Sequence, residues 1–169
     1  TPLFEILTQL TQQIKELEIE IERLSKEIYP ETKYISQVPG VGPITALSYV
    51  LYIENPARFT KSRQVGPFLG LTPKRDQSGD IDKQLSITKA GNTYLRHLLV
   101  GCAQYIMGPF GPESDLRLHG LGIAARGGKN AKKRAAIAVA RKLAVLLHRL
   151  WITNKEYQPF YNIHNKEAA

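Results

Sequence analysis

Apolar residues recur in alternating steps of four and three along the first 28 positions of the chain. In heptad terms Leu fills the d positions and Ile fills most of the a positions, a combination that favours two parallel helices. Pro30 ends the pattern. The seam consists of Leu3, Leu7, Leu10, Ile14, Leu17, Ile21, Leu24 and Ile28. We therefore predict a coiled-coil dimerisation helix over residues 1–30, with a helix packed on its own domain as the alternative.

Downstream, the apolar spacing and the positions of Gly and Pro predict several shorter helices. They cover residues 44–53, 62–69, 92–107, 114–126 and 130–151, and a short apolar piece covers residues 34–38. Residues 72–86 are polar and punctuated by Gly, which favours a loop or an irregular hairpin. The predicted fold is mostly α: a long N-terminal coiled-coil helix followed by a compact helical domain over residues 31–169.

The segment Val-Pro-Gly-Val-Gly-Pro-Ile-Thr-Ala, which begins at residue 38, resembles the hairpin of helix-hairpin-helix DNA-binding modules. Glycines let such a backbone turn tightly and approach a phosphate closely. The first amides of the following helix would then meet the phosphate at the positive end of the helix dipole. We predict a helix-hairpin-helix over about residues 34–53 that contacts the backbone of duplex DNA through Gly40, Val41, Gly42 and Thr45. An ordinary turn between two helices is the alternative.

A second group of residues combines a serine with cations. Ser78 follows Lys74 and Arg75 in a Gly-flanked segment, and Lys89 and Arg96 come at the start of the next predicted helix. A serine hydroxyl becomes a nucleophile when its proton is removed and the attacked group is polarised. Phosphoryl transfer depends on positioning and on positive charge, which Lys and Arg supply. Spacing alone leaves an ordinary polar turn as the alternative.

In their order along the chain, these motifs look like the C-terminal domain of the Insertion Sequence 110 family of transposases (the 110/116/902 group). The motifs are Pro-Gly-Val-Gly-Pro-x-Thr-Ala at residues 39–46, Arg-Phe at 58–59, Gly-Leu-x-Pro at 70–73, Ser-Gly at 78–79, Thr-Lys-x-Gly-Asn at 88–92 and Leu-Arg at 95–96. The resemblance implies a serine loop over about residues 70–90. It implies that Ser78 attacks a DNA phosphate to give a covalent phosphoserine intermediate, and we expect Arg75, Lys89 and Arg96 to lie around that phosphate.

The resemblance also implies parts that lie outside this sequence. In that family an N-terminal RuvC-like domain with four metal-binding carboxylates acts with the serine domain, and a structured RNA guides target choice. Nothing in this chain resembles the RuvC-like domain, and the chain starts at Thr1 inside a predicted helix. We therefore expect a fragment that is inactive alone and holds no cofactor, with Mg²⁺ in the absent domain. The competing hypothesis is a non-catalytic helix-hairpin-helix module for DNA binding and dimerisation, and the long coiled coil disfavours a ribosomal or RNA-only protein.

The net charge of +8 is concentrated in one segment, because residues 116–152 contain nine Lys and Arg but no Asp or Glu. Cations at the start of a helix oppose its dipole, and a bound polyanion would relieve that repulsion. We predict contacts with a DNA or RNA backbone in and before the basic helix of about residues 130–151, with a solvated helix face as the alternative. The predicted contacts are Lys129, Lys132, Lys133 and Arg134, together with Lys74 near the serine.

Composition narrows the remaining possibilities. Cys102 is the single cysteine, so no internal disulfide forms, and no signal peptide or membrane span is visible. We interpret Asp76, Asp80 and Asp82 as turn residues and predict no metal site, since the four histidines show no ligand spacing. We expect a cytoplasmic, nucleoid-associated protein of a bacterium or archaeon. Its expected partners are double-stranded DNA, a guide RNA and a second copy of itself, with a tetramer left open, and no membrane.

Overall fold

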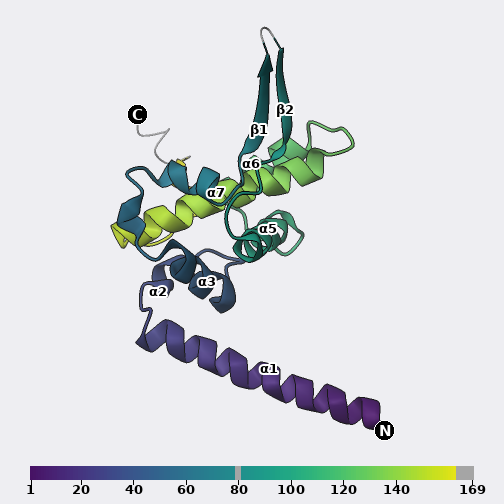
Figure 1. Cartoon of the computed structure of the whole chain (residues 1–169), viewed down its shortest axis with the longest axis vertical. Coiled ribbons are helices and arrows are strands. Elements are labelled where there is room, and N and C mark those ends of the chain that lie inside the picture. Colours follow the sequence, from purple (N-terminus) through teal and green to yellow (C-terminus); the bar gives the residue numbers. More distant parts are fainter. Residues whose placement is uncertain (79–80, 163–169) are drawn as a thin grey trace.

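The computed structural model describes the backbone of residues 1–78 and 81–162, and the side chains of that range other than those of residues 75–84. Helices make up most of it, together with one two-stranded sheet (Figure 1). In chain order the elements are α1 (Pro2–Glu27), α2 (Thr32–Ile35), α3 (Pro43–Ile53), η1 (Pro56–Arg58), η2 (Ser62–Gln64), α4 (Val65–Phe68), β1 (Pro73–Ser78), β2 (Ile81–Ile87), α5 (Thr93–Met107), α6 (Asp115–Ala124) and α7 (Ala131–Thr153). The mostly α prediction is confirmed.

Helix α7 runs through the centre of the helical body and contacts α2, α4, α5 and α6. Its fully buried residues recur at four-residue spacing as Ala135, Val139, Leu143 and Leu147, because positions four apart lie on one face of a helix. The phenol of Tyr49 in α3 donates a hydrogen bond of 2.7 Å to the carbonyl of Ala144, and burial raises the pKa of that phenol. The core is thus built around one helix whose alanines let its neighbours approach closely.

The segment between α3 and α4 is fastened to α7 by a buried histidine. His148 is fully buried, and its Nε2 donates to the carbonyl of Pro56 at 2.9 Å. Its Nδ1 lies 3.0 Å from the Ser62 hydroxyl, and the ring of Phe59 meets the imidazole edge-on with 5.5 Å between centroids. These contacts hold η1 and η2 against the C-terminal half of α7.

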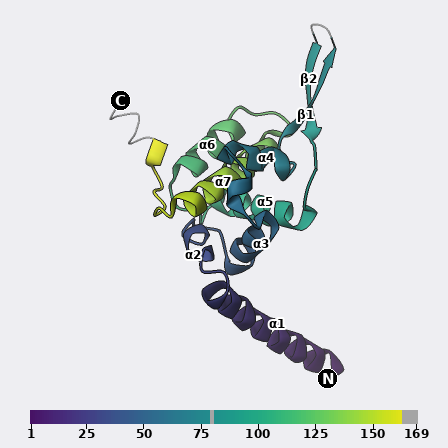
Figure 2. The ribbon, with the colours of Figure 1, turned by 60° about the vertical axis from the view of Figure 1, so that its left-hand side comes forward.

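Helix α1 extends away from the helical body (Figures 1 and 2). None of its residues is buried, and it contacts α2 and α3. Its predicted seam is open to solvent from Leu3 to Leu17, where Leu3, Leu7, Leu10, Ile14 and Leu17 are each between 50% and 67% exposed, and it is partly buried at Ile21 and Leu24. The helix therefore presents an apolar stripe that its own chain does not cover.

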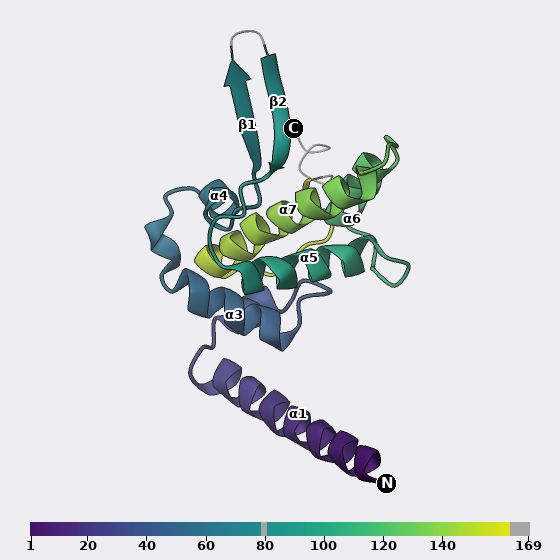
Figure 3. The same cartoon turned by 45° about the vertical axis from the view of Figure 1, so that its right-hand side comes forward.

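The serine loop predicted over residues 70–90 is a β-hairpin. Strands β1 and β2 pair in antiparallel fashion, with an irregularity in register between Pro73 and Arg75. The hairpin projects from the body at the end opposite α1 (Figure 3). Because the ribbon projects from the body instead of packing on it, its sequence needs no alternation of apolar and polar residues, and the usual strand signal is missing.

Among the helices of residues 1–162 that the structure describes, none is both long and apolar enough to cross a bilayer.

Candidate nucleic-acid interface and serine hairpin

Ser78 lies at the far end of the hairpin. Its backbone pairs with Ile81, whereas Pro73 pairs with Ile87 at the base. Five residue steps separate Pro73 from Ser78, which corresponds to about 17 Å at roughly 3.3 Å per residue. The hairpin therefore carries the serine well clear of the helical body (Figure 3). Asp80 and the side chains of Arg75, Asp76, Ser78 and Asp82 lie outside the described residues.

The base of the hairpin is tightly joined to the body. The amide of Thr88 donates to the carbonyl of Thr72 at 2.9 Å, and the amide of Lys89 donates to that of Gly70 at 3.2 Å. Gly70 and Gly91 both have positive φ, and a Cβ on either would collide with backbone, at Ala90 and at Phe68 respectively. Only glycine fits this crossing, because two backbone segments meet there without room for side chains.

The Arg96 side chain stabilises the same crossing of the two backbone segments. It is only 6% exposed, and its guanidinium donates to the carbonyls of Leu69 at 3.1 Å and Ala90 at 2.7 Å, and to the Thr93 hydroxyl at 3.2 Å. Asn92 caps α5 by accepting a hydrogen bond of 2.8 Å from the amide of Leu95. The Thr-Lys-x-Gly-Asn and Leu-Arg motifs thus hold the two ends of the hairpin together.

The four residues predicted to surround a phosphate are not gathered at one point. Ser78 is at the tip of the hairpin, and Arg75 lies three residues before it, paired with Gln84. Lys89 is at the base with an exposed side chain and a φ of 59°, a left-handed value unusual for lysine. Arg96 is engaged with main-chain carbonyls beneath the base. Lys74, near the base in β1, is exposed.

The predicted DNA-binding hairpin at residues 39–42 leads directly into α3. Gly42 is the N-cap residue and Pro43 opens the helix, as its missing amide hydrogen allows. The amide of Ala46 bonds the carbonyl of Gly42, so the earlier amides of Ile44 and Thr45 have no partner within the helix. Helix α2 before the hairpin has only four residues, so a full helix-hairpin-helix stays a prediction.

The side chains of this hairpin divide between core and surface. Val41 and Thr45 are buried, and the Thr45 hydroxyl lies 3.7 Å from the sulfur of Cys102. Gly40 has a φ of 90°, and a Cβ there would lie 2.7 Å from the ring of Tyr105. Gly42 is exposed, and a Cβ on it would meet no atom within 4 Å. The part open to a ligand is therefore the backbone around Gly42.

A hollow of about 660 Å³ lies between the backbone around Gly42 and a second wall that was not predicted from the sequence. That wall is α5, where His97, Gly101 and Tyr105 follow each other at four-residue spacing. Gly101, like Gly42, has open space beside its Cα. The four-residue spacing places these three residues on one face of α5. It indicates a wall of the hollow only when α5 is known to pack beside α3.

The predicted basic cluster lies at the start of α7. Lys129, Lys132, Lys133 and Arg134 are all exposed, and within the described ranges none of them pairs with a carboxylate. The N-cap residue Asn130 makes no side-chain hydrogen bond, and the first turn holds no acidic residue. Positive charge and unbonded helix amides thus face solvent together.

No group of three or more His, Cys, Asp or Glu side chains gathers within residues 1–74 and 85–162 in a way that would hold a metal ion.

The chain is similar in sequence to known transposases. Residues 32–118 match the family described as Transposase IS116/IS110/IS902. The chain is 30% identical over 165 residues to a probable family 20 transposase of Pseudomonas aeruginosa, an alignment that covers 94% of this chain and 48% of that one. It is 29% identical over 156 residues to the transposase for insertion sequence element IS1111A of Coxiella burnetii, covering 92% and 42% respectively.

The chain thus spans about half the length of these curated relatives. The matched region contains the hairpin at residues 39–42, the serine hairpin and the Arg96 crossing, in the order in which the family resemblance places their motifs. Because of the family match over residues 32–118 and the similarity to these transposases, the chain belongs to the IS116/IS110/IS902 family of transposases.

Proposed function

We propose that this chain is the serine-bearing part of a DNA recombinase. Its oxygen nucleophile is Ser78, whose hydroxyl loses its proton as the oxygen forms a bond to the phosphorus of a DNA phosphodiester. The bond to one deoxyribose oxygen breaks, and that oxygen takes up a proton and leaves as a hydroxyl group. The energy of the phosphodiester stays in the phosphoserine link, so a second DNA hydroxyl can reverse the step on a new strand. The observation that carries the proposal is the place of Ser78 in a family-matched segment, at the tip of a projecting hairpin.

The remaining parts of the proposal concern the longer protein. A RuvC-like domain with four carboxylates would hold Mg²⁺, which stabilises charge on the attacked phosphate. A guide RNA would choose the target, and the protein would act at the nucleoid in the cytoplasm of a bacterium or archaeon. The separation of Ser78 from Lys89 and Arg96 supports a need for such a partner, because these two cations lie at the base of the hairpin and Ser78 lies at its far end.

The experiment that tests the proposal traps the covalent intermediate. The full-length protein with its guide RNA is mixed with a DNA substrate nicked so that the leaving strand diffuses away. Because the reverse reaction then lacks its hydroxyl, a protein–DNA adduct should accumulate. Mass spectrometry of the digested adduct should place the nucleotide on the peptide containing Ser78. An adduct on another residue would refute the assignment.

A second candidate function is a non-catalytic module that binds DNA and dimerises. The observation that favours it is the burial of Arg96 among carbonyls, which removes one cation from the predicted site. The adduct experiment separates the two functions, because a module that only binds DNA yields no covalent species.

If the hairpin at residues 39–42 contacts DNA, one substitution there should have opposite effects on the stability of the protein and on its affinity for DNA. Gly42→Asp should raise the free energy of unfolding by about 0.5 kcal/mol, because a carboxylate caps the α3 amides and favours the dipole. The same carboxylate should lower affinity for duplex DNA by about tenfold, since it repels a phosphate bound at those amides. Thermal unfolding and fluorescence anisotropy measure the two quantities. Gly42→Ser caps without charge and serves as the control, and unchanged affinity in Gly42→Asp would exclude the hairpin from the interface.

The exposed stripe on α1 predicts a homodimer through a coiled coil. Replacing Leu17 and Ile21 with Glu should convert the dimer into a monomer in sedimentation equilibrium, because two like charges would face each other at adjacent core positions. Glu at Gln9 and Lys15, outside the seam, is the matched control and should leave the mass unchanged. Persistence of the dimer after the seam substitutions would show that the subunits meet elsewhere.

A further inference from the structure

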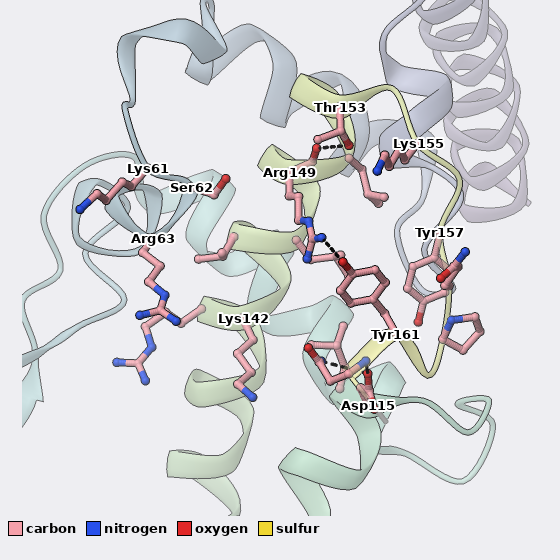
Figure 4. Close-up of a pocket in the computed structure, with 18 of the residues that line it drawn as sticks. Lys61, Ser62, Arg63, Asp115, Lys142, Arg149, Thr153, Lys155, Tyr157 and Tyr161 are labelled. Carbon is pink, nitrogen blue, oxygen red and sulfur yellow. Dashed lines mark hydrogen bonds between the residues drawn. The ribbon is translucent and has the colours of Figure 1, made fainter. Parts of the chain in front are cut away.

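A groove of about 1150 Å³ lies along the C-terminal half of α7 (Figure 4). Helix α7 forms its floor, and residues 61–63 form one wall. The other wall consists of the start of α6 and of residues 155–162, which we call the C-terminal strap. Of the site residues predicted from sequence, none whose side chain is described lines this α7 groove.

Three hydrogen bonds donated by backbone amides fix the C-terminal strap in place. The amide of Asp115 donates to the carbonyl of Pro159 at 2.8 Å, and the amide of Asn162 donates to the Asp115 carboxylate at 2.7 Å. The amide of Tyr157 donates to the Gln37 side chain at 2.8 Å. The wall formed by residues 61–63 is held to α7 through the contact between Ser62 and His148. Both walls of the α7 groove are therefore fixed by hydrogen bonds.

Six cations gather in the α7 groove. They are Lys61, Arg63, Arg141, Lys142, Arg149 and Lys155. Two acidic residues, Asp115 and Glu156, also line it, and the Asp115 carboxylate already accepts two hydrogen bonds from Asn162. Within the part of the chain that the structure describes, none of the six cations forms an ion pair. An excess of six cations over two carboxylates is typical of a surface that binds a polyanion.

The nearby His119 responds to this charge. Burial lowers the pKa of its imidazole, and Lys142 and Arg141 lower that pKa further. The positive charge of Lys142 and Arg141 thus adds to burial in disfavouring a protonated imidazole.

The chemistry of the floor distinguishes between kinds of polyanion. Val145, Leu146 and Leu150 line the floor between the cations. The guanidinium of Arg149 lies over the ring of Tyr161, 4.3 Å from its centroid, and also donates to its hydroxyl at 2.6 Å. Apolar surface and stacked planar groups bind the faces of bases, which a duplex hides and a single strand exposes.

The dimensions of the α7 groove fit a polymer. Its volume exceeds the roughly 300–1,000 Å³ typical of small-molecule sites. Arg141 and Arg149 are eight residues apart along α7, or about 12 Å, so these cations can meet more than one phosphate.

We propose that the α7 groove binds a single-stranded segment of nucleic acid, with phosphates on the six cations and bases against the floor and the Arg149–Tyr161 pair. The proposal shares with the function proposed above only a nucleic acid as partner, and it does not depend on Ser78.

Anisotropy titrations of the 169-residue chain test this with three probes of about 12 units: oligo-dT, oligo-U and a duplex. Lys142→Gln with Arg149→Gln should weaken single-strand binding about tenfold and reduce the log–log salt slope by about 1.4, since each single-strand phosphate contact contributes about 0.7. Tyr161→Leu should weaken it at least about fivefold through lost stacking, whereas Tyr161→Phe should not. A preference for oligo-U or oligo-dT identifies RNA or DNA as the source of the strand.

Lys15→Gln with Lys26→Gln on α1 makes the same change in net charge and should leave all three affinities unchanged. Equal losses in both double variants would show that net charge alone is measured and would overturn the proposal. Equal losses for duplex and single strands would overturn its single-strand character. Thermal unfolding of each variant confirms that it is folded. Because Ser78 is intact in every variant, failure here leaves the adduct experiment unaffected, and the converse also holds.

Discussion

Replacing Ser78 with alanine in the full-length protein should abolish strand exchange, with a loss of at least about a thousandfold. The covalent protein–DNA adduct should vanish with it, because alanine has no oxygen to attack the phosphate. DNA affinity should be unchanged, since the predicted backbone contacts lie around Gly42 and at the start of α7. A recombination assay, a gel for the adduct and a binding titration measure the three quantities.

Two companion variants of the hairpin sharpen that result. Ser86→Ala removes an exposed hydroxyl from β2 and should have a mild effect. Ser78→Cys should keep a trace of activity, since a thiolate is also a nucleophile. Full recombination by Ser78→Ala would refute the catalytic assignment and leave the DNA-binding function in its place.

Replacing Arg96 with methionine should lower the free energy of unfolding by about 3 kcal/mol. The substitution leaves the carbonyls of Leu69 and Ala90 buried without their charged donor, and each such loss costs roughly 1–3 kcal/mol. For a chain of this length the midpoint of thermal unfolding should fall by about 9 °C. Hydrogen exchange should also show lost protection of the amides of Thr88 and Lys89, which close the base of the hairpin.

Lys89 provides the matched comparison for Arg96. Lys89→Asn suits the left-handed backbone at this position and should leave stability unchanged or slightly raised. If Lys89 contacts the phosphate, that variant should lose recombination while staying fully folded. Arg96→Lys should fall between wild type and methionine, because one ammonium cannot serve both carbonyls in the geometry of the guanidinium fork. Unchanged amide protection in Arg96→Met would contradict a positioning role for this residue.

The longer helices could be predicted because each carries its own periodic signal, whereas α2, with only four residues, is predicted only as a short apolar piece. The four-residue recurrence of apolar positions in α7 and the heptad of α1 depend only on which helix face meets a surface. Capping residues such as Asn92 and Ser114 also lie where sequence rules expect them. The β-hairpin has no such signal in its sequence, because its two strands pair with each other and the ribbon projects from the body instead of packing on it.

The contact partners of long polar side chains could not be predicted from the sequence. Arg96 belongs to a motif next to a serine loop, so a phosphate contact was a reasonable hypothesis, yet its guanidinium is buried among carbonyls. The α7 groove is a comparable case. Lys61 and Arg149 are far apart in sequence and line the same groove only because His148 fastens the segment that contains Ser62 to α7.

The joint between hairpin and body turns the serine hairpin into a mechanical lever. Ser78 sits about 17 Å from a pivot held by Gly70, Gly91 and Arg96, so a tilt of about 10° at the pivot moves the serine by about 3 Å. Reacting atoms must approach to about 3–3.5 Å, so for the nucleophile proposed above a displacement of that size would decide between reaction and no reaction. Stiffness at the pivot therefore sets how far the serine strays from its target, and substitutions there should alter reaction rate without touching DNA.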